Sequence, residues 1–241
     1  MDVMEEHGLY RRRHLPHWDL PGATYFITTC LAGSIPAEGM LDLECFRNGL
    51  VKPNPNDSHP LSEKKDLAWK RYFARADWWL DQQPAVRHFS APRLSEIVVD
   101  AFHHWAGKRY DLLAYVVMPS HIHWVFRPIV GQVVNLSSEC SGQVDNLSYN
   151  GKIRSPRERI MHSFKRHTAR ECNIVLHKQG SFWQDESYDR CVRDDDELLR
   201  IIQYVENNPV KAGMVEQAKM WKYSSAYQRR IGDIPLGMTI K

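Results

Sequence analysis

The sequence predicts an α+β domain in which helices cover one face of an antiparallel sheet. The expected elements follow the order strand, helix, strand, strand, helix, strand, helix, which suits such a sheet. The helical segments carry apolar residues at intervals of three and four, the spacing of a core-facing stripe. With 241 residues, 43% of them hydrophobic, the chain can bury one sizeable core, so a single domain with insertions is expected.

The first elements are a strand, a helix and a strand pair. Residues 24–31 alternate as a strand does. Residues 91–108 are expected to form a helix with this buried stripe: Leu94, Ile97, Val98, Ala101, Phe102 and Trp105. Residues 112–118 and 121–127 are rich in β-branched and aromatic residues, and a Pro-Ser pair interrupts them. They are expected to pair as antiparallel strands.

A second helix is expected to begin at Ser155. Ser155, Pro156 and Glu158 would supply an N-cap, a proline in the first turn and a capping-box carboxylate. The expected core residues are Ile160, Met161, Phe164 and Thr168. The basic residues of this region would point outward: Lys152, Arg154, Arg157, Arg159, Lys165, Arg166 and Arg170. Such a face is either simply solvated or a contact for phosphates. Residues 181–192 are then expected to form an extended edge.

The last helix is the most clearly marked. Asp194 is a good N-cap, with Glu197 as its capping-box partner. The core stripe consists of Leu198, Ile201, Ile202 and Val205. Tyr204 and Asn208 lie one turn apart beside this stripe, so both would look toward whatever the helix packs against. Pro209 disfavours helical geometry at Asn208, so the helix is expected to end there.

Composition limits the remaining possibilities. The net charge is only +3, so the overall field is a poor argument for nucleic acid. Five cysteines lie far apart without a Cys-x-x-Cys pair, which argues against a zinc knuckle and against a disulfide framework. No long apolar run or N-terminal signal is found, so we expect a soluble, cytoplasmic protein with no membrane partner.

His121 and His123 are the most informative pair in the chain. Side chains at i and i+2 of a strand share a face, so the two imidazoles would lie side by side while Ile122 points into the core. Two imidazoles placed in this way can bind one metal ion together, and the preceding proline and serine would place them at a sheet edge. The alternative is a half-buried strand with two satisfied histidines.

Tyr204 is the favoured nucleophile because an amide, Asn208, follows one helical turn later. Tyr188 is the competing nucleophile, in an extended segment next to carboxylates, and its alternative role is to pack beneath the helix. The histidines on predicted helices have no acidic or cysteine partner at a matching spacing and are expected to be surface or core residues: His103, His104, His162 and His167.

His-x-His on a strand, followed by Tyr-x-x-x-Asn on a late helix, resembles the HUH endonucleases with one catalytic tyrosine. Residues 14–28, 180–184 and 204–213 resemble corresponding segments of the REP-associated tyrosine transposases, within the IS200/IS605-like group. The similarity covers roughly residues 11–36 and 90–225. Each motif alone is weak, but chance does not readily place four of them in the expected order.

The resemblance implies a ferredoxin-like sandwich, the HUH endonuclease fold, as one domain over residues 11–225. Two insertions and a C-terminal tail depart from it: about 37–88, 129–154 and 226–241. The first insertion contains Trp69, Trp78 and Trp79 among charges, which suggests a locally folded unit with short helices. The second is rich in Ser, Asn and Gly and resembles a mobile loop.

The resemblance also implies chemistry. Tyr204 would attack a DNA phosphate to give a 5′-phosphotyrosine and a free 3′ hydroxyl. The catalytic residues would be Tyr204, His121 and His123, and the metal ligands would be His121, His123 and Asn208. Ligand softness admits Zn or Mn as readily as Mg, whereas the family favours Mg or Mn.

The implied partner is single-stranded or hairpin DNA, with a monomer favoured over a homodimer. The candidate DNA contacts are Arg11, Arg12, Arg13, Lys165, Arg166 and Arg170. Two other functions stay open: a metal-dependent phosphodiesterase that uses water, and a catalytically inactive DNA-binding relative.

Overall fold

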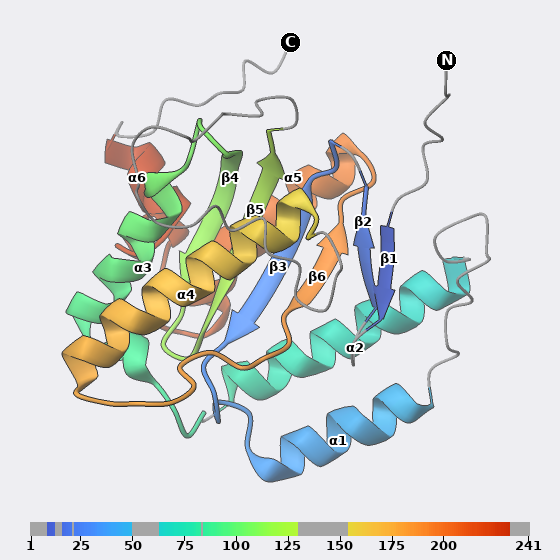
Figure 1. Cartoon of the computed structure of the whole chain (residues 1–241), viewed down its shortest axis with the longest axis horizontal. Coiled ribbons are helices and arrows are strands. Elements are labelled where there is room, and N and C mark those ends of the chain that lie inside the picture. Colours follow the sequence, from blue (N-terminus) through green and yellow to red (C-terminus); the bar gives the residue numbers. More distant parts are fainter. Residues whose placement is uncertain are drawn as a thin grey trace.

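The computed structural model describes residues 9–12, 16–20, 22–49, 63–82, 84–129 and 154–231. Its centre is a four-stranded antiparallel sheet in the spatial order β4-β5-β3-β6 (Figure 1). The strands are β3 (Tyr25–Cys30), β4 (Tyr110–Val117), β5 (His121–Pro128) and β6 (Tyr188–Cys191). A separate strand pair lies beside β6, formed by β1 (Leu9–Arg12) and β2 (Pro16–Asp19). The predicted α+β class is confirmed.

β5, which carries the two histidines, is an inner strand. It pairs with β4 on one side and β3 on the other, and His123 lies directly opposite Thr28. The predicted position of the histidines at a sheet edge is therefore wrong. The sequence marked two neighbouring strands but contained no local signal for the strands that flank them, because that order depends on pairings between distant segments.

One face of the sheet is covered by α3 (Pro92–His104) and α4 (Pro156–Leu176); in Figure 1, α4 crosses in front of the strands and α3 lies at the left, beside β4. Ile27, Ile122 and Trp124 point to this side and pack with Phe102 and Phe164. The predicted capping box at Ser155 is present, with both the Ser155 and the Glu158 hydrogen bonds formed. These two helices form the aromatic core.

The other face is covered by α5 (Asp195–Lys211), whose Leu198 and Val205 pack on Val116 and Val125. The expectation that helices cover only one face is therefore wrong. A sheet with apolar residues on both faces needs a covering layer on each side. Successive residues of β4 and β5 point to opposite faces, and most of them are buried. α6 (Ser225–Ile231) packs against β4, and the two 3₁₀ turns are η1 (His88–Ser90) and η2 (Ala218–Met220).

Two predictions about α5 have opposite outcomes. Asp194 caps α5 by accepting a hydrogen bond from the Glu197 amide, as predicted. The helix does not end at Asn208 but continues through Pro209 to Lys211. A proline in the last turn forgoes only one backbone hydrogen bond, and the amide of Ala212 still bonds to the Asn208 carbonyl at 2.9 Å.

Arg157 does not point outward, although it belongs to the basic cluster predicted on the surface of α4. Its guanidinium is buried between the carboxylates of Asp19 and Asp189, at 2.6 Å and 2.7 Å. Position 157 lies three residues before Ile160, on the same core-facing stripe, which explains the burial. The pair ties the start of α4 to β2 and β6.

The segment predicted as a first insertion contains α1 (Ala37–Asn48) and α2 (Glu63–Asp81). α2 has 19 residues, so the prediction of short helices is wrong for it. It is also not a separate unit, because Ala76 and Leu80 pack with Cys30 and Tyr188 of the sheet. α2 therefore shares a face of the sheet with α5.

Residues 130–153 lie outside the described residues, so the predicted second insertion is not assessed, and the proposed boundaries of the domain stay predictions. None of the helices in the described ranges combines the length and the apolar character that crossing a bilayer requires.

Candidate active site

The two histidines lie together on the α5 face of the sheet. Their ring centroids are 4.8 Å apart, and both side chains are essentially inaccessible to solvent. Ile122, between them, points to the aromatic core on the other face. The strand alternation expected from the sequence therefore places both imidazoles on one side, as predicted.

Each histidine has a hydroxyl partner on its Nδ1 atom. His123 Nδ1 lies 2.8 Å from Thr28 Oγ1 on the neighbouring strand, and His121 Nδ1 lies 3.0 Å from Ser120 Oγ. When an Nδ1 proton is donated to such an oxygen, Nε2 carries the free lone pair. Both rings can thus present Nε2 to a ligand.

Asn208 and Tyr204 of α5 lie beside this pair. Asn208 is buried, and its Nδ2 donates to His123 Nε2 at 3.1 Å. The Tyr204 ring lies 5.6 Å from the His123 ring, in an edge arrangement. The structure therefore brings together the four residues that the sequence grouped as a site.

The Tyr204 hydroxyl has a partner that the sequence did not suggest. It donates a hydrogen bond to Asp77 Oδ2 at 2.6 Å, and Asp77 belongs to α2. One turn later, Asp81 pairs with Lys211 of α5 at 2.7 Å. Two contacts thus join α2 to the tyrosine helix.

Burial controls the charges in this cluster. Loss of solvation lowers the pKa of His121 to about 3, and burial together with His121 lowers that of His123 well below its usual value. Burial also raises the pKa of Tyr204, and the Asp77 carboxylate raises it further. Loss of solvation raises the pKa of Asp77 to about 7. Both imidazoles are therefore neutral at neutral pH, the form that binds metals.

The donor atoms of the cluster suit a divalent cation. His121 Nε2 and Asn208 Oδ1 are buried and have no hydrogen-bond partner within the described part of the chain. Unpaired buried polar atoms are costly and call for an explanation such as an ion. A half-turn of the amide exchanges its nitrogen and oxygen, so Oδ1 can also face the imidazoles. His121, His123 and Asn208 thus fit a metal, although no group of three or more His, Cys, Asp or Glu side chains in the described ranges does.

The predicted DNA-contacting residues lie elsewhere. Lys165, Arg166 and Arg170 are on α4, which covers the face opposite the histidines. Lys165 Nζ donates to the carbonyls of Gln184 and Asp185 at 2.6 and 3.2 Å, and Arg170 pairs with Glu171. The side chains of Arg11 and Arg12, and all of Arg13, fall outside the described residues. Their role in DNA binding stays a prediction.

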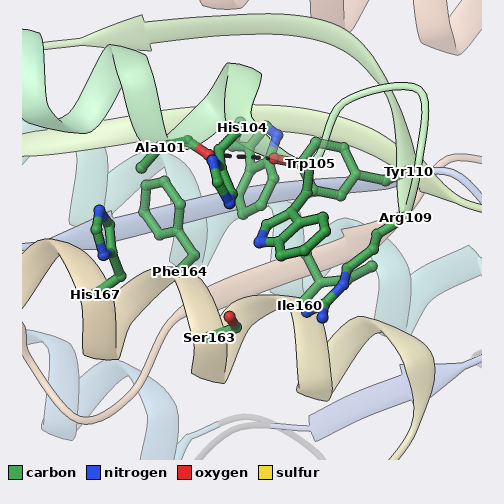
Figure 2. Close-up of a pocket in the computed structure, with 10 residues that line it drawn as sticks. Ala101, His104, Trp105, Arg109, Tyr110, Ile160, Ser163, Phe164 and His167 are labelled. Carbon is green, nitrogen blue, oxygen red and sulfur yellow. Dashed lines mark hydrogen bonds between the residues drawn. The ribbon is translucent and has the colours of Figure 1, made fainter. Parts of the chain in front are cut away.

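A cavity of about 140 Å³ lies between α3 and α4 (Figure 2). Trp105 and Phe164 form apolar walls, His104 and His167 contribute imidazoles, and the Arg109 guanidinium stacks 3.9 Å above the Trp105 ring. None of the residues predicted to be catalytic or to bind metal lines it. The cavity is therefore separate from the histidine, tyrosine and asparagine cluster.

With this geometry in view, comparisons with known proteins give one relative by sequence. The chain is 25% identical over 124 residues to a Haemophilus influenzae protein named as a candidate REP-associated tyrosine transposase. This chain is a homologue of that protein. The match spans 49% of this chain and 60% of the length of the relative. No family model matches the chain.

A solved structure, of a REP-associated tyrosine transposase bound to a REP hairpin, aligns with 94% of this chain and 88% of its own. The identity is 16% and the TM-score is 0.43. A score of that size does not establish a shared fold. The relation to the REP-associated tyrosine transposases therefore rests on the sequence match.

Sequence reasoning missed three residues of this cluster: Thr28, Ser120 and Asp77. Thr28 could have been found, because it lies on a predicted strand and alternation sets its face once the strand pairing is known. Ser120 was recognised only as part of the break before β5. Asp77 had no sequence signal, because its helix lies in a segment unlike the family.

Proposed function

We propose that this protein cleaves and rejoins single-stranded DNA through a covalent bond to Tyr204. The observation that supports it is the cluster itself, in which a tyrosine, two neutral imidazoles and an amide from two elements share one buried site. The homologous protein is named for a tyrosine-dependent transposase, which matches this set of residues.

In the proposed reaction the Tyr204 oxygen attacks the phosphorus of a DNA linkage, and the bond to the 3′ oxygen breaks. The 5′ phosphate becomes joined to Tyr204, and a 3′ hydroxyl is released. The ester formed keeps the energy of the broken linkage, so the reverse attack by a 3′ hydroxyl rejoins the strand without ATP. A covalent tyrosine link thus accounts for both halves of strand transfer.

Each residue of the cluster has a proposed role in this reaction. His121, His123 and Asn208 would hold a divalent cation such as Mg²⁺ or Mn²⁺. When bound, it would polarise the scissile phosphate and stabilise its developing charge. Thr28 and Ser120 orient the two imidazoles through their Nδ1 atoms. Phe26 contacts both the His123 and the Tyr204 rings, which limits how far the tyrosine can turn.

The proposed substrate is a strand that forms a hairpin, as the family resemblance implies. The basic side chains of α4 are the candidate contacts to the DNA backbone, and Arg166 and Arg170 are the exposed ones among them. Contacts of this kind fix the register of the strand, whereas sequence preference needs contacts to bases or to DNA shape.

The test is the formation of an adduct that resists denaturation. The protein is incubated with hairpin DNA labelled on the 3′ side of the cleavage point and with Mg²⁺ or Mn²⁺, and then separated under denaturing conditions. We expect a labelled protein band that disappears in Tyr204→Phe, which lacks only the hydroxyl. Tyr188→Phe is the matched control and should retain the band. Loss of the band in Tyr188→Phe with retention in Tyr204→Phe would reverse the assignment, and no wild-type adduct would refute the proposal.

A further inference from the structure

The Tyr204 hydroxyl is held by a carboxylate from outside the resembling part of the chain. Asp77 Oδ2 accepts its hydrogen bond at 2.6 Å. Among the described residues Asp77 forms no salt bridge, and Tyr204 is its hydrogen-bond partner. A carboxylate that is only 7% exposed would ordinarily be paired with a cation. The tyrosine hydroxyl is therefore the main polar partner of a buried acid.

Among the described residues, no cation forms an ion pair with the Asp77 carboxylate. Asp81, one turn along α2, raises the pKa of Asp77, whereas the Lys211 ammonium on α5 pairs with Asp81 and lowers the pKa of Asp77 only through space. Tyr188 of β6 and Cys30 of β3 also face it at electrostatic range, and burial raises the pKa of both, so both stay protonated and neutral. Asp77 is thus free to take a proton.

We propose that Asp77 is the general base that accepts the Tyr204 proton when the tyrosine oxygen attacks DNA. This inference rests on the proposed function. As the bond between the Tyr204 oxygen and phosphorus forms and the bond from phosphorus to the 3′ oxygen breaks, the phenolic proton moves to Asp77. The departing 3′ oxygen takes a proton from solvent. In the rejoining step, Asp77 returns its proton to the tyrosine oxygen.

The surroundings explain why the nucleophile needs such a base. Burial opposes formation of a free phenolate, because a lone negative charge is poorly solvated there. Transfer to a carboxylate already within hydrogen-bond distance leaves the net charge of the pair unchanged. The pKa of Asp77, raised by burial to about 7, lies close to working pH, where a general base is most effective.

The experiment is single-turnover cleavage of hairpin DNA by the full chain with Mg²⁺ or Mn²⁺. Asp77→Asn keeps the size of the side chain and an oxygen that can accept the hydrogen bond, but it cannot take the proton at neutral pH. We expect its rate constant to fall by about 100-fold or more, with hairpin affinity unchanged. Asp81→Asn is the matched control, one turn away, and should cleave within a few-fold of wild type at pH 8.

The pH profile separates a base from an anchor for the tyrosine ring. The wild-type rate should rise with pH and level off above about 7, as Asp77 loses its own proton. Asp81→Asn should shift this step to lower pH, because the Asp81 charge raises the pKa of Asp77. This measurement leaves position 77 unchanged, so it decides the question even where Asp77→Asn does not fold.

Two outcomes would overturn the inference alone, given a wild-type adduct on Tyr204. They are wild-type cleavage by folded Asp77→Asn, and a pH step that does not move in Asp81→Asn. Absence of any wild-type adduct would instead refute the proposed function, and this inference with it.

Discussion

On the α3 and α4 face of the sheet the buried groups are rings: Phe102 stacks 4.9 Å from Phe164 and lies 5.1 Å from Trp124. On the α5 face, the same central strands bury Thr28, His121 and His123, which meet Asn208. Alternation along β5 assigns one residue to each side in turn. A single strand thus stabilises the fold with one set of side chains and places reactive groups with the other.

The two faces also differ in the kind of polar atom that they leave unpaired. Within the described residues, the unpaired atoms on the α5 face include two potential metal ligands, His121 Nε2 and Asn208 Oδ1, whereas on the aromatic face they include Thr29 Oγ1 and Trp124 Nε1, and such unsatisfied groups lower stability. The aromatic face offsets this cost through extensive apolar burial. Changes on the aromatic face should therefore alter stability, and changes on the α5 face should alter chemistry more than stability.

The largest expected effect is on the aromatic face. Phe102→Ala should lower the free energy of unfolding by about 3–5 kcal/mol, because Phe102 is fully buried among rings that cannot close the cavity left. Urea denaturation measures it. Leu199→Ala, at a half-exposed position on α5, is the control and should change it by less than about 1 kcal/mol. Similar losses for both variants would contradict the distinction between core and surface.

The second largest expected effect is a loss of stability in acid that arises on the α5 face. Folding keeps His121 neutral, because burial lowers its pKa to about 3, whereas the unfolded chain protonates it below its ordinary value of 6.5. His121 therefore does not lower the free energy of unfolding above pH 6.5, and it lowers that free energy progressively as the pH falls below 6.5. In chelator, the stability of His121→Leu relative to wild type should rise by about 2 kcal/mol between pH 8 and pH 5. Comparing the two proteins cancels the opposite contribution of Asp77, and a constant difference would refute the neutral assignment.

At pH 8, His121→Leu tests whether the unpaired polar atom on the α5 face lowers stability. His121→Leu removes the unpaired Nε2 atom, and Ser120 Oγ keeps a contact to the Leu80 carbonyl at 3.5 Å. In chelator we expect the free energy of unfolding to rise by about 1 kcal/mol. In buffer without chelator, calorimetry should show weakened Mn²⁺ binding. A less stable variant would mean that Nε2 is already satisfied in the metal-free protein.

The smallest expected effect is at the rim of the site. Lys211→Met removes the pair with Asp81, in which the lysine side chain is 55% exposed, so unfolding should change by less than about 1 kcal/mol. Thermal denaturation at low and high salt measures it, and the small difference should shrink with salt. A loss of several kcal/mol would show that this pair holds α2 in place.

Local patterns predicted much of this molecule. The strand pair around Pro119, the cap at Ser155 and the apolar stripe of α5 each depend on residues close in sequence, and all three are present. The period of β5 places His121 and His123 on one face, and the period of α5 places Tyr204 and Asn208 one turn apart. The two pairs also meet, as the family resemblance implied. Their catalytic roles stay predictions.

What could not be predicted depends on contacts between distant segments. The inner position of β5, the use of both sheet faces and the burial of Arg157 each follow from which elements meet. Asp77 is the clearest case, because nothing near it in sequence marks it, and only the packing of α2 against α5 brings it to Tyr204.

The hydrogen bonds of the site also span long stretches of chain, and this has a consequence for biosynthesis. Thr28 and His123 are 95 residues apart, His123 and Asn208 are 85, and Asp77 and Tyr204 are 127. Because a chain is made from its N-terminus, α2 and the strands β3, β4 and β5 are all synthesised before α5. A ribosome-bound chain that has not reached residue 204 therefore lacks the proposed nucleophile. The proposed ability to cut DNA would arise only after α5 has been made.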